Sequence, residues 1–299
     1  MIGRYAPSPT GTLHLGNLRT ALLAWLFARS AGSAFLMRVE DLDAGRVRPG
    51  LAEAQLADLA AIGLDWEAPV MTQSERLEHY AAAIARLEAD GRLYPCYCTR
   101  REIREAASAP HGPLPEGAYP GTCRELSAAE RAERERLGRP PALRLRAGGE
   151  RVAFDDALVG HVEAVVDDVV VRRNDGAPAY NLAVVVDDAA QGVEQVVRGA
   201  DLAEGTPRQI LLARVLGLPV PSYAHVPLVL GADGARLAKR HGAVTLADRL
   251  ALGETPARVR GELMRTVGLA GPGEEPSMDA LLARFDPARL PREPTTLAA

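Results

Sequence analysis

The sequence contains few cysteines, few aromatic residues and little lysine, and it has no long apolar run. Its three cysteines are an odd count and are too few for a disulfide framework. No stretch of about 18 apolar residues is present, so no membrane span is expected. The N-terminus has no basic start followed by a long apolar stretch, so no secretory signal is expected either. These absences favour a cytoplasmic protein.

The charge balance limits how the chain can bind nucleic acid. The formal net charge of -4 argues against a protein that binds nucleic acid over its whole surface. Basic residues nevertheless gather at 131–146 and 236–240, where a local patch could form. With 299 residues, 47% apolar and 25% charged, the composition is that of a globular protein with one large or two medium domains.

The beginning of the chain has the pattern of a doubly wound α/β domain. Residues 1–5 and 34–39 have the character of strands, and between them Leu18, Leu22 and Leu26 recur at helical spacing. A strand, a helix and a strand in this order predict a parallel sheet. The GxGxxG pattern of dinucleotide-binding proteins is absent from this segment.

Three further regions follow the opening segment. Cysteines, a loop rich in proline and glycine and a charged helix at 127–137 mark residues 95–165 as an insertion. We predict that 1–94 and 166–245 form one α/β domain and that 246–299 is a short helical tail with a loose, proline-rich end. Strands are expected at 167–173, 180–187, 192–198 and 223–230, and helices at 51–63, 74–91 and 208–217.

The segment PSPTGTLHLGN, residues 7–17, favours a phosphate site. Its prolines and glycines hold the backbone in a tight turn directly before a helix. A helix N-terminus attracts phosphate through its free N–H groups and its dipole. His14 lies where an imidazole can meet a phosphate. A solvent-facing loop with an incidental histidine is the alternative, since so short a pattern is common by chance.

A second basic segment, Arg236-Leu237-Ala238-Lys239-Arg240, follows a strand near the end of the α/β part. Three cations in five residues can neutralise charge that develops on a reacting triphosphate. A solvated charged turn is the alternative for such a run.

The two segments together resemble the signatures of class I aminoacyl-tRNA synthetases. HLGN resembles the HIGH signature, with Asn17 in place of the second histidine, and RLAKR resembles the KMSKS signature in the form seen in the glutamyl branch. The likeness covers most of residues 1–245. It includes GRYAPSPTGTLHLGNLRTALLAWLFAR, FLMRVEDLD, YNLAVVVDD, VVRGADL and TPRQ. The resemblance implies a Rossmann-like catalytic domain that activates glutamate with ATP and Mg²⁺.

The resemblance also assigns residues to this site. It implies that His14 and Lys239 are catalytic. The ATP-binding residues that it implies are His14, Gly16, Asn17, Arg236, Lys239 and Arg240. The glutamate-binding residues that it implies are Arg4, Tyr5, Ala6, Pro7, Ser8, Glu40, Tyr180 and Arg198. A carboxylate such as Glu40 suits an ammonium group, and the arginine fork suits a carboxylate. A structural ion pair is the alternative for Glu40 and Arg198.

The cysteines point to a local metal site. Cys96, Cys98 and Cys123 supply three thiolates, and tetrahedral zinc takes four ligands. Candidates for the fourth ligand lie in the intervening loop and are His111, Glu116 and Tyr119. Chemistry alone favours His111, whereas the resemblance implies Tyr119, because YPGTC matches the short members of the glutamyl branch. The zinc would be structural, and three buried free thiols are the alternative.

The part of the chain after Arg240 is short. The 59 residues there leave little room for a separate anticodon-binding domain. This length, and Val184 where longer members commonly carry asparagine, resemble the short members of the branch. Their likeness implies a monomer that activates glutamate without tRNA and transfers it to queuosine at the wobble position of tRNA(Asp). A fragment that charges tRNA(Glu), a paralogue without enzymatic activity and a domain specific for another amino acid are the alternatives.

Overall fold

The computed structural model describes residues 1–99, 101–103, 118–231, 233–235, 237 and 242–297. His111, Glu116, Arg236, Lys239 and Arg240 lie outside this part of the chain. None of the helices that it contains is both long enough and apolar enough to cross a membrane.

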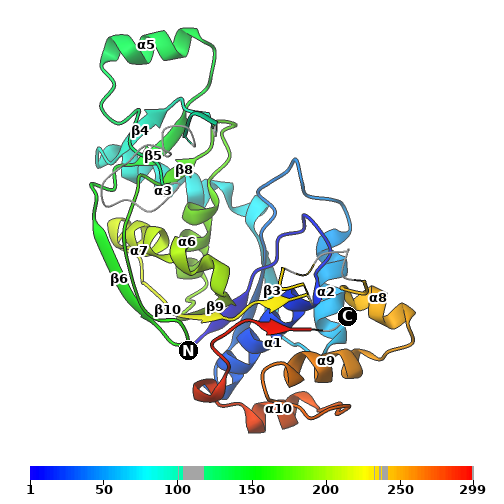
Figure 1. The fold of residues 1–299 in the computed structure, drawn as a ribbon. Helices are drawn as coiled ribbons and strands as arrows, with labels where there is room; N and C mark the ends of the chain where they lie inside the picture. The colour runs from blue at the N-terminus through cyan, green and yellow to red at the C-terminus, as the bar shows by residue number, and fades with distance from the viewer. Residues whose placement is uncertain (100, 104–117, 232, 236, 238–241, 298–299) are drawn as a thin grey trace.

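A seven-stranded sheet forms the centre of the molecule (Figure 1). Its strand order is β3-β2-β1-β9-β10-β6-β7. The strands are β1 (Gly3–Tyr5), β2 (Phe35–Val39), β3 (Glu67–Thr72), β6 (Arg151–Asp156), β7 (Gly160–Val165), β9 (Gln195–Gly199) and β10 (Ser222–Val226). All neighbours are parallel except β6 and β7. The chain switches direction across the sheet between β1 and β9, and ligands bind at the carboxyl ends of the strands at such a point.

Helices cover both faces of this sheet, which confirms the predicted α/β class. They are α1 (Leu15–Ser30), α2 (Leu51–Ala61), α3 (Leu77–Ala89), α6 (Tyr180–Ala190) and α7 (Thr206–Val215). Buried apolar residues of α1 belong to one core cluster, and those of α3, α6 and α7 belong to another. Short 3-10 turns are η1 (Gln73–Arg76), η2 (Ala200–Gly205) and η4 (Pro287–Arg289).

The tail packs against α1, and its described residues remain packed as far as Leu297. It contains α8 (Leu246–Ala251), α9 (Pro256–Arg265), α10 (Met278–Arg284) and β12 (Thr295–Thr296), which pairs with β11 (Val229–Leu230). Arg19 of α1 is fully buried and donates hydrogen bonds to Pro227, Thr266 and Thr295. Leu297 is buried as well, so the residues predicted to be loose complete the core up to this position.

A second, smaller sheet carries Cys96 and lies beside the other two cysteines. It consists of β4 (Leu93–Cys96), β5 (Ala142–Leu145) and β8 (Val170–Arg172), and the exposed helix α5 (Ala128–Arg136) projects beyond it (Figure 1). The strands do not follow the predicted boundary of the insertion. β6 and β7 fall within 95–165 but extend the main sheet, and β8 follows residue 165 but belongs to the small sheet. The division into domains therefore stays a prediction.

Residues 180–187 form helix α6, so the predicted strand is wrong. Three consecutive valines favoured a strand because β-branched residues are enriched there. In the structure Leu182, Ala183 and Val185 are buried in the core cluster that α3 and α7 share. Asp187 and Asp188, one turn further on, are buried against arginines. Packing with distant elements thus outweighs the local preference.

Candidate functional site

The HLGN segment forms the N-terminal cap of α1. The His14 imidazole Nδ1 accepts a hydrogen bond from the Asn17 backbone N–H at 3.2 Å, and the Asn17 side-chain oxygen accepts one from the His14 N–H at 3.1 Å. This reciprocal pair is a capping box in which histidine and asparagine take the usual places of serine and glutamate. It fixes the first turn of α1, whose positive dipole end suits a phosphate.

The segment that follows the second signature reaches this cap. The Leu15 N–H donates to the Val244 carbonyl at 2.8 Å, and His14 forms a β-bridge with Thr245. Residues at the two ends of the α/β part therefore lie side by side at the N-terminus of α1. The basic residues Arg236, Lys239 and Arg240 lie outside the described residues.

Gly16 has little space around it. A Cβ atom at this position would lie 3.0 Å from His14 Nδ1 and Cε1 and 3.5 Å from Val229 Cβ. We expect Gly16→Ala to displace the His14 ring and to raise the KM for ATP by about tenfold, because small misplacements at a reacting centre are costly. ATP–pyrophosphate exchange measures this. Gly45→Ala, at an exposed glycine with only one atom of Asp43 at 4.0 Å, is the matched control. An unchanged KM for ATP in Gly16→Ala would contradict the assignment.

A cavity of about 340 Å³ opens at the switch point of the sheet. Nine predicted site residues line it, namely Arg4, Tyr5, Ala6, Pro7, Ser8, Asn17, Glu40, Tyr180 and Arg198. They come from the ends of β1, β2 and β9 and from the starts of α1 and α6. The structure thus brings all predicted glutamate-side residues together. His14 and Gly16 are not among the lining residues of this cavity.

Charged groups at one side of the cavity form a connected, buried network. Asp188 accepts hydrogen bonds from Arg4 at 3.2 and 3.3 Å and from Arg38 at 2.7 Å. Arg38 also pairs with Glu40 at 3.1 Å. Burial raises the pKa of Glu40, and the nearby Arg38 and Arg4 lower it. Glu40 is therefore partly a structural partner, as the alternative held, while it also lines the cavity.

Arg198 differs from Arg4, the other arginine that lines the cavity. It is 6% exposed, and it donates to His225 Nε2 at 3.0 Å, Gln209 Oε1 at 2.8 Å and Thr206 Oγ1 at 2.7 Å. Among the described residues it forms no ion pair with a carboxylate, so the structural ion pair considered for it is not found. A buried guanidinium held only by uncharged groups is suited to pair with an anionic ligand.

Sequence reasoning missed several residues that support the cavity. Gln55 of α2 is 2% exposed and donates to the carbonyls of Ser8 at 3.0 Å and Gly11 at 2.7 Å, so it fixes the loop after β1. Asp188 and Arg38 lay within segments that carried the family resemblance but received no role. No local signal marks Gln55, because its partners are more than 40 residues away.

A larger cavity, about 1050 Å³, begins beside the first and extends to the cysteines. The two share Ser8, Glu40 and Tyr180. The far part is lined by Cys96, Cys98 and Arg144. Further lining residues are the arginines Arg46, Arg139, Arg173 and Arg208. Carboxylates line it as well, and two of them pair with arginines of the wall, Asp167 with Arg208 and Asp43 with Arg173. The wall of this cavity thus carries charges of both signs and connects the small sheet to the site.

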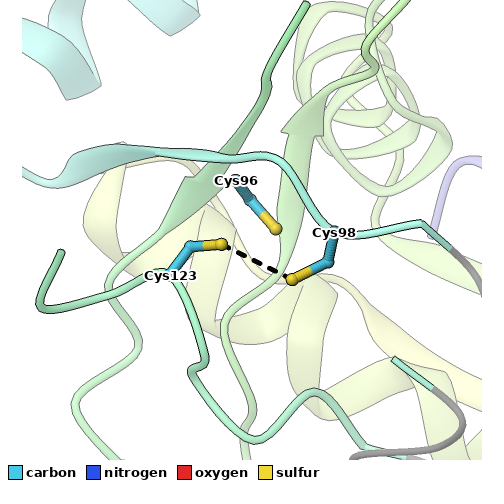
Figure 2. A group of neighbouring side chains, drawn as sticks. All are labelled: Cys96, Cys98 and Cys123. Carbon is cyan, nitrogen blue, oxygen red and sulfur yellow. Dashed lines mark hydrogen bonds between the residues drawn. The ribbon is translucent and has the colours of Figure 1, made fainter. Parts of the chain in front are cut away.

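The three cysteines converge beside the small sheet, as Figure 2 shows. Their sulfur atoms all lie within 4.8 Å of one another, and Cys98 and Cys123 Sγ are 3.4 Å apart. Thiolates on one tetrahedral zinc ion lie about 3.8 Å apart, so only small shifts are needed. Hydrogen bonds from the other two thiols lower the pKa of Cys96, whereas the same group of thiols raises the pKa of Cys98, so one of the three favours the thiolate form without a metal. The cluster could therefore hold a metal ion.

Tyr119 lies at the same point. Its hydroxyl oxygen is 3.5 Å from Cys96 Sγ and 3.9 Å from Cys98 Sγ. The Cys123 N–H donates to this oxygen at 2.7 Å, and the Arg144 guanidinium lies 3.7 Å from the centre of the ring. The structure thus brings the four predicted ligands together, with a cation beside the phenol. The alternative ligands His111 and Glu116 lie outside the described residues.

Comparison with known proteins gives consistent matches. Residues 1–275 match the family described as tRNA synthetases class I (E and Q), catalytic domain. A protein of Nocardia farcinica named glutamyl-Q tRNA(Asp) synthetase is 66% identical over 99% of this chain and 92% of its own length. A protein of the same name from Symbiobacterium thermophilum is 53% identical over 100% of this chain and 96% of its own length.

A solved structure has the same fold. The glutamate tRNA ligase from Elizabethkingia meningosepticum, crystallised with its amino acid, matches with a TM-score of 0.83 and 25% identity. The match covers 99% of this chain and 66% of that ligase. The fold of this chain therefore resembles about two thirds of a longer glutamate tRNA ligase.

Proposed function

Because the chain belongs to the class I tRNA synthetases for glutamate and glutamine and is an ATP-dependent ligase, we propose that it activates glutamate with ATP and transfers it to queuosine in tRNA(Asp). The observation that carries the glutamate specificity is Arg198, a buried cation in the cavity without a described carboxylate partner. The names of the two relatives, which match nearly the whole chain, support the acceptor.

In this proposal the cavity of about 340 Å³ binds glutamate. The side-chain carboxylate pairs with Arg198, and the ammonium group lies near Glu40. Arg4 provides a second cation, which Asp188 holds in place at 3.2 and 3.3 Å. Ser8 donates its hydroxyl to the Glu40 carbonyl at 2.8 Å and so keeps the loop after β1 beside β2. These contacts orient the α-carboxylate of glutamate toward the N-terminus of α1.

ATP then lies with its phosphates at the cap formed by His14, Gly16 and Asn17. The glutamate α-carboxylate attacks the α-phosphorus, a new oxygen–phosphorus bond forms, and pyrophosphate leaves as glutamyl-adenylate is made. Positioning and charge stabilisation supply the catalysis. Mg²⁺ that arrives with ATP neutralises phosphate charge.

The second signature supplies the remaining cations in this proposal, Arg236, Lys239 and Arg240. Lys239 is the single lysine among the 35 lysine and arginine residues of the sequence. Lysine presents a compact ammonium group that an arginine fork does not reproduce. Its occurrence only at this position supports a specific role on the reacting phosphates.

The larger cavity is the proposed route for the nucleic acid. It reaches the glutamate site at Ser8, Glu40 and Tyr180, so a base inserted there can approach the activated carbonyl. Exposed arginines at its edge, such as Arg46 and Arg139, suit phosphate groups. A hydroxyl of the queuosine cyclopentene-diol attacks the carbonyl carbon of glutamyl-adenylate, the acyl–phosphate bond breaks and AMP leaves.

We also propose that Cys96, Cys98, Tyr119 and Cys123 hold one structural zinc ion. The ion would fasten the end of β4, which lines the larger cavity, to the segment around Tyr119. No step of the reaction needs it. We further propose that the protein acts as a monomer, and the substrates support a place in the cytoplasm.

The test has two stages. Exchange of pyrophosphate into ATP is expected with glutamate in the absence of tRNA, and transfer of labelled glutamate is expected to queuosine-containing tRNA(Asp) but not to the unmodified tRNA. Periodate, which cleaves the diol, should abolish acceptance. Exchange that needs tRNA(Glu), with glutamate at the 3′ end, would favour a glutamyl-tRNA synthetase fragment. No exchange at all would favour a non-enzymatic paralogue.

A further inference from the structure

A buried histidine that has no role in the proposed reaction forms a hydrogen bond with Arg198. His225 of β10 is 0% exposed, and its Nε2 accepts the hydrogen bond from Arg198 Nε at 3.0 Å. Its Nδ1 lies 2.6 Å from Asp156 Oδ2 of β6. We propose that Asp156 and His225 are positioning residues that hold Arg198 ready to select the carboxylate of glutamate over the amide of glutamine. This inference rests on the proposed function.

The hydrogen bonds fix which nitrogen of His225 carries the proton. Asp156 accepts hydrogen bonds from the backbone N–H groups of Leu158, Val159 and His225, and these bonds, with His225, hold its pKa below the usual range. An ionised carboxylate only accepts, so Nδ1 of the imidazole must donate to it. Nε2 of a neutral imidazole then has a lone pair, and that lone pair faces Arg198 Nε.

This arrangement orients Arg198 without neutralising it. The ring of His225 is held between strands and stacks on Tyr223 at 5.9 Å with an interplanar angle of 9°. The contrast with Arg4 is direct, because Arg4 pairs with the carboxylate of Asp188. Asp156, in contrast, is separated from Arg198 by the imidazole. The full charge of Arg198 is therefore offered to the ligand, and a neutral amide gains less from it than a carboxylate does.

The arrangement also makes glutamate binding sensitive to acid. Groups facing the imidazole are Asp156 from β6, Arg198 from β9, Asp201 from η2, Thr206 from α7 and Tyr223 from its own strand. Burial is the largest cause that lowers the pKa of His225 below its usual range, so the ring stays neutral near pH 7 and gains its second proton only in more acidic solution. The protonated ring has no acceptor for Arg198 and repels it.

Two substitutions of His225 test the inference. His225→Phe replaces the imidazole with an aromatic ring that has no nitrogen, and we expect the ratio of kcat/KM for glutamate to that for glutamine to fall by about tenfold or more. The KM for ATP should not change. His225→Gln restores an acceptor that does not titrate, so it should keep the ratio within about threefold of the wild type. Loss of stability alone would not change a selectivity ratio.

The pH profile provides a second measurement. The KM for glutamate of the wild type should rise as the pH falls from about 7.5 to about 5.5, whereas that of His225→Gln should stay nearly level over this range. His161→Phe is the matched control, because His161 also pairs with an aspartate, Asp155, at 2.8 Å but is exposed on β7. His161→Phe should match the wild type in the ratio of kcat/KM for glutamate to glutamine and in the pH dependence of the KM for glutamate.

The outcomes separate this inference from the proposed function. If the wild type shows no glutamate-dependent exchange, the proposed function fails. If the wild type is active and folded His225→Phe keeps its selectivity ratio, the inference is wrong. If His225→Phe does not fold, His225→Gln decides, and a wild-type pH dependence retained in His225→Gln overturns the inference.

Discussion

Replacing Arg198 with alanine is expected to lower kcat/KM for glutamate in ATP–pyrophosphate exchange by about two to three orders of magnitude. Arg198 is 6% exposed, and its uncharged partners leave its charge for the ligand. Without the Arg198 guanidinium, the side-chain carboxylate of glutamate would be buried in the cavity without the cation that pairs with it. Breaking a buried charge pair by removing one member typically costs about 3–5 kcal/mol. At about 1.4 kcal/mol per tenfold, the lower part of this range corresponds to two to three orders of magnitude.

Two comparisons make this result specific. Arg151→Ala removes a 64% exposed arginine that pairs with Glu163 on the hairpin of β6 and β7, and it should leave exchange unchanged. Arg198→Lys retains a charge but not the fork, so it should recover only part of the activity. If Arg198→Ala is folded and retains wild-type kcat/KM for glutamate, the glutamate site has been placed wrongly.

The second large effect concerns the metal. Protein purified without chelators is expected to contain about one zinc ion per chain, and Cys123→Ser should lose it. Zinc in isolated finger peptides contributes about 10–16 kcal/mol. The loss of folding free energy here should be smaller, several kcal/mol, because hydrogen bonds already hold the ligands. Asp167 accepts the Tyr119 N–H at 2.9 Å, and Asp168 accepts Arg124 Nε at 2.6 Å.

Zinc content, thermal unfolding and amide hydrogen exchange measure this effect. Removal of zinc should raise exchange in β4 and around Tyr119 more than in β1 and β9, because the two sheets are separate. Tyr119→Phe keeps the ring and removes the phenol oxygen, so weaker zinc binding in this variant would support Tyr119 as the fourth ligand. If Tyr119→Phe binds zinc as tightly as the wild type, another residue is the fourth ligand. Purified protein without any metal would refute the zinc site.

The glutamate-side residues could be predicted because their contacts are shared by a whole family. The likeness of the segment around Arg4 and Ser8 to that family was sufficient to group residues that the structure places around one cavity. Position in the sequence alone would not have grouped Arg4 with Arg198. The two lie on different strands of the sheet, and only the parallel order β2-β1-β9 brings their carboxyl ends together.

The supporting residues could not be predicted, because each depends on a partner far away in the chain. Asp156 and His225 are 69 residues apart, and Arg4 and Asp188 are 184 apart. No spacing rule links such pairs. Asp156 also lay within the predicted insertion, whereas its strand belongs to the main sheet. The pair behind Arg198 therefore becomes visible only when the sheet is assembled.

The sequence by itself determined the local chemistry: the cap at His14 and Asn17, the cysteines around residue 96, and a basic segment with the single lysine. These features depend on side chains close together in the chain or on family likeness. The tertiary structure decided that residues 180–187 form a helix and that the tail packs onto the core. It also decided which buried arginines pair with a carboxylate, as Arg4 does with Asp188. The physical reason is that burial and long-range ion pairs outweigh local preferences, and both exist only in the assembled fold.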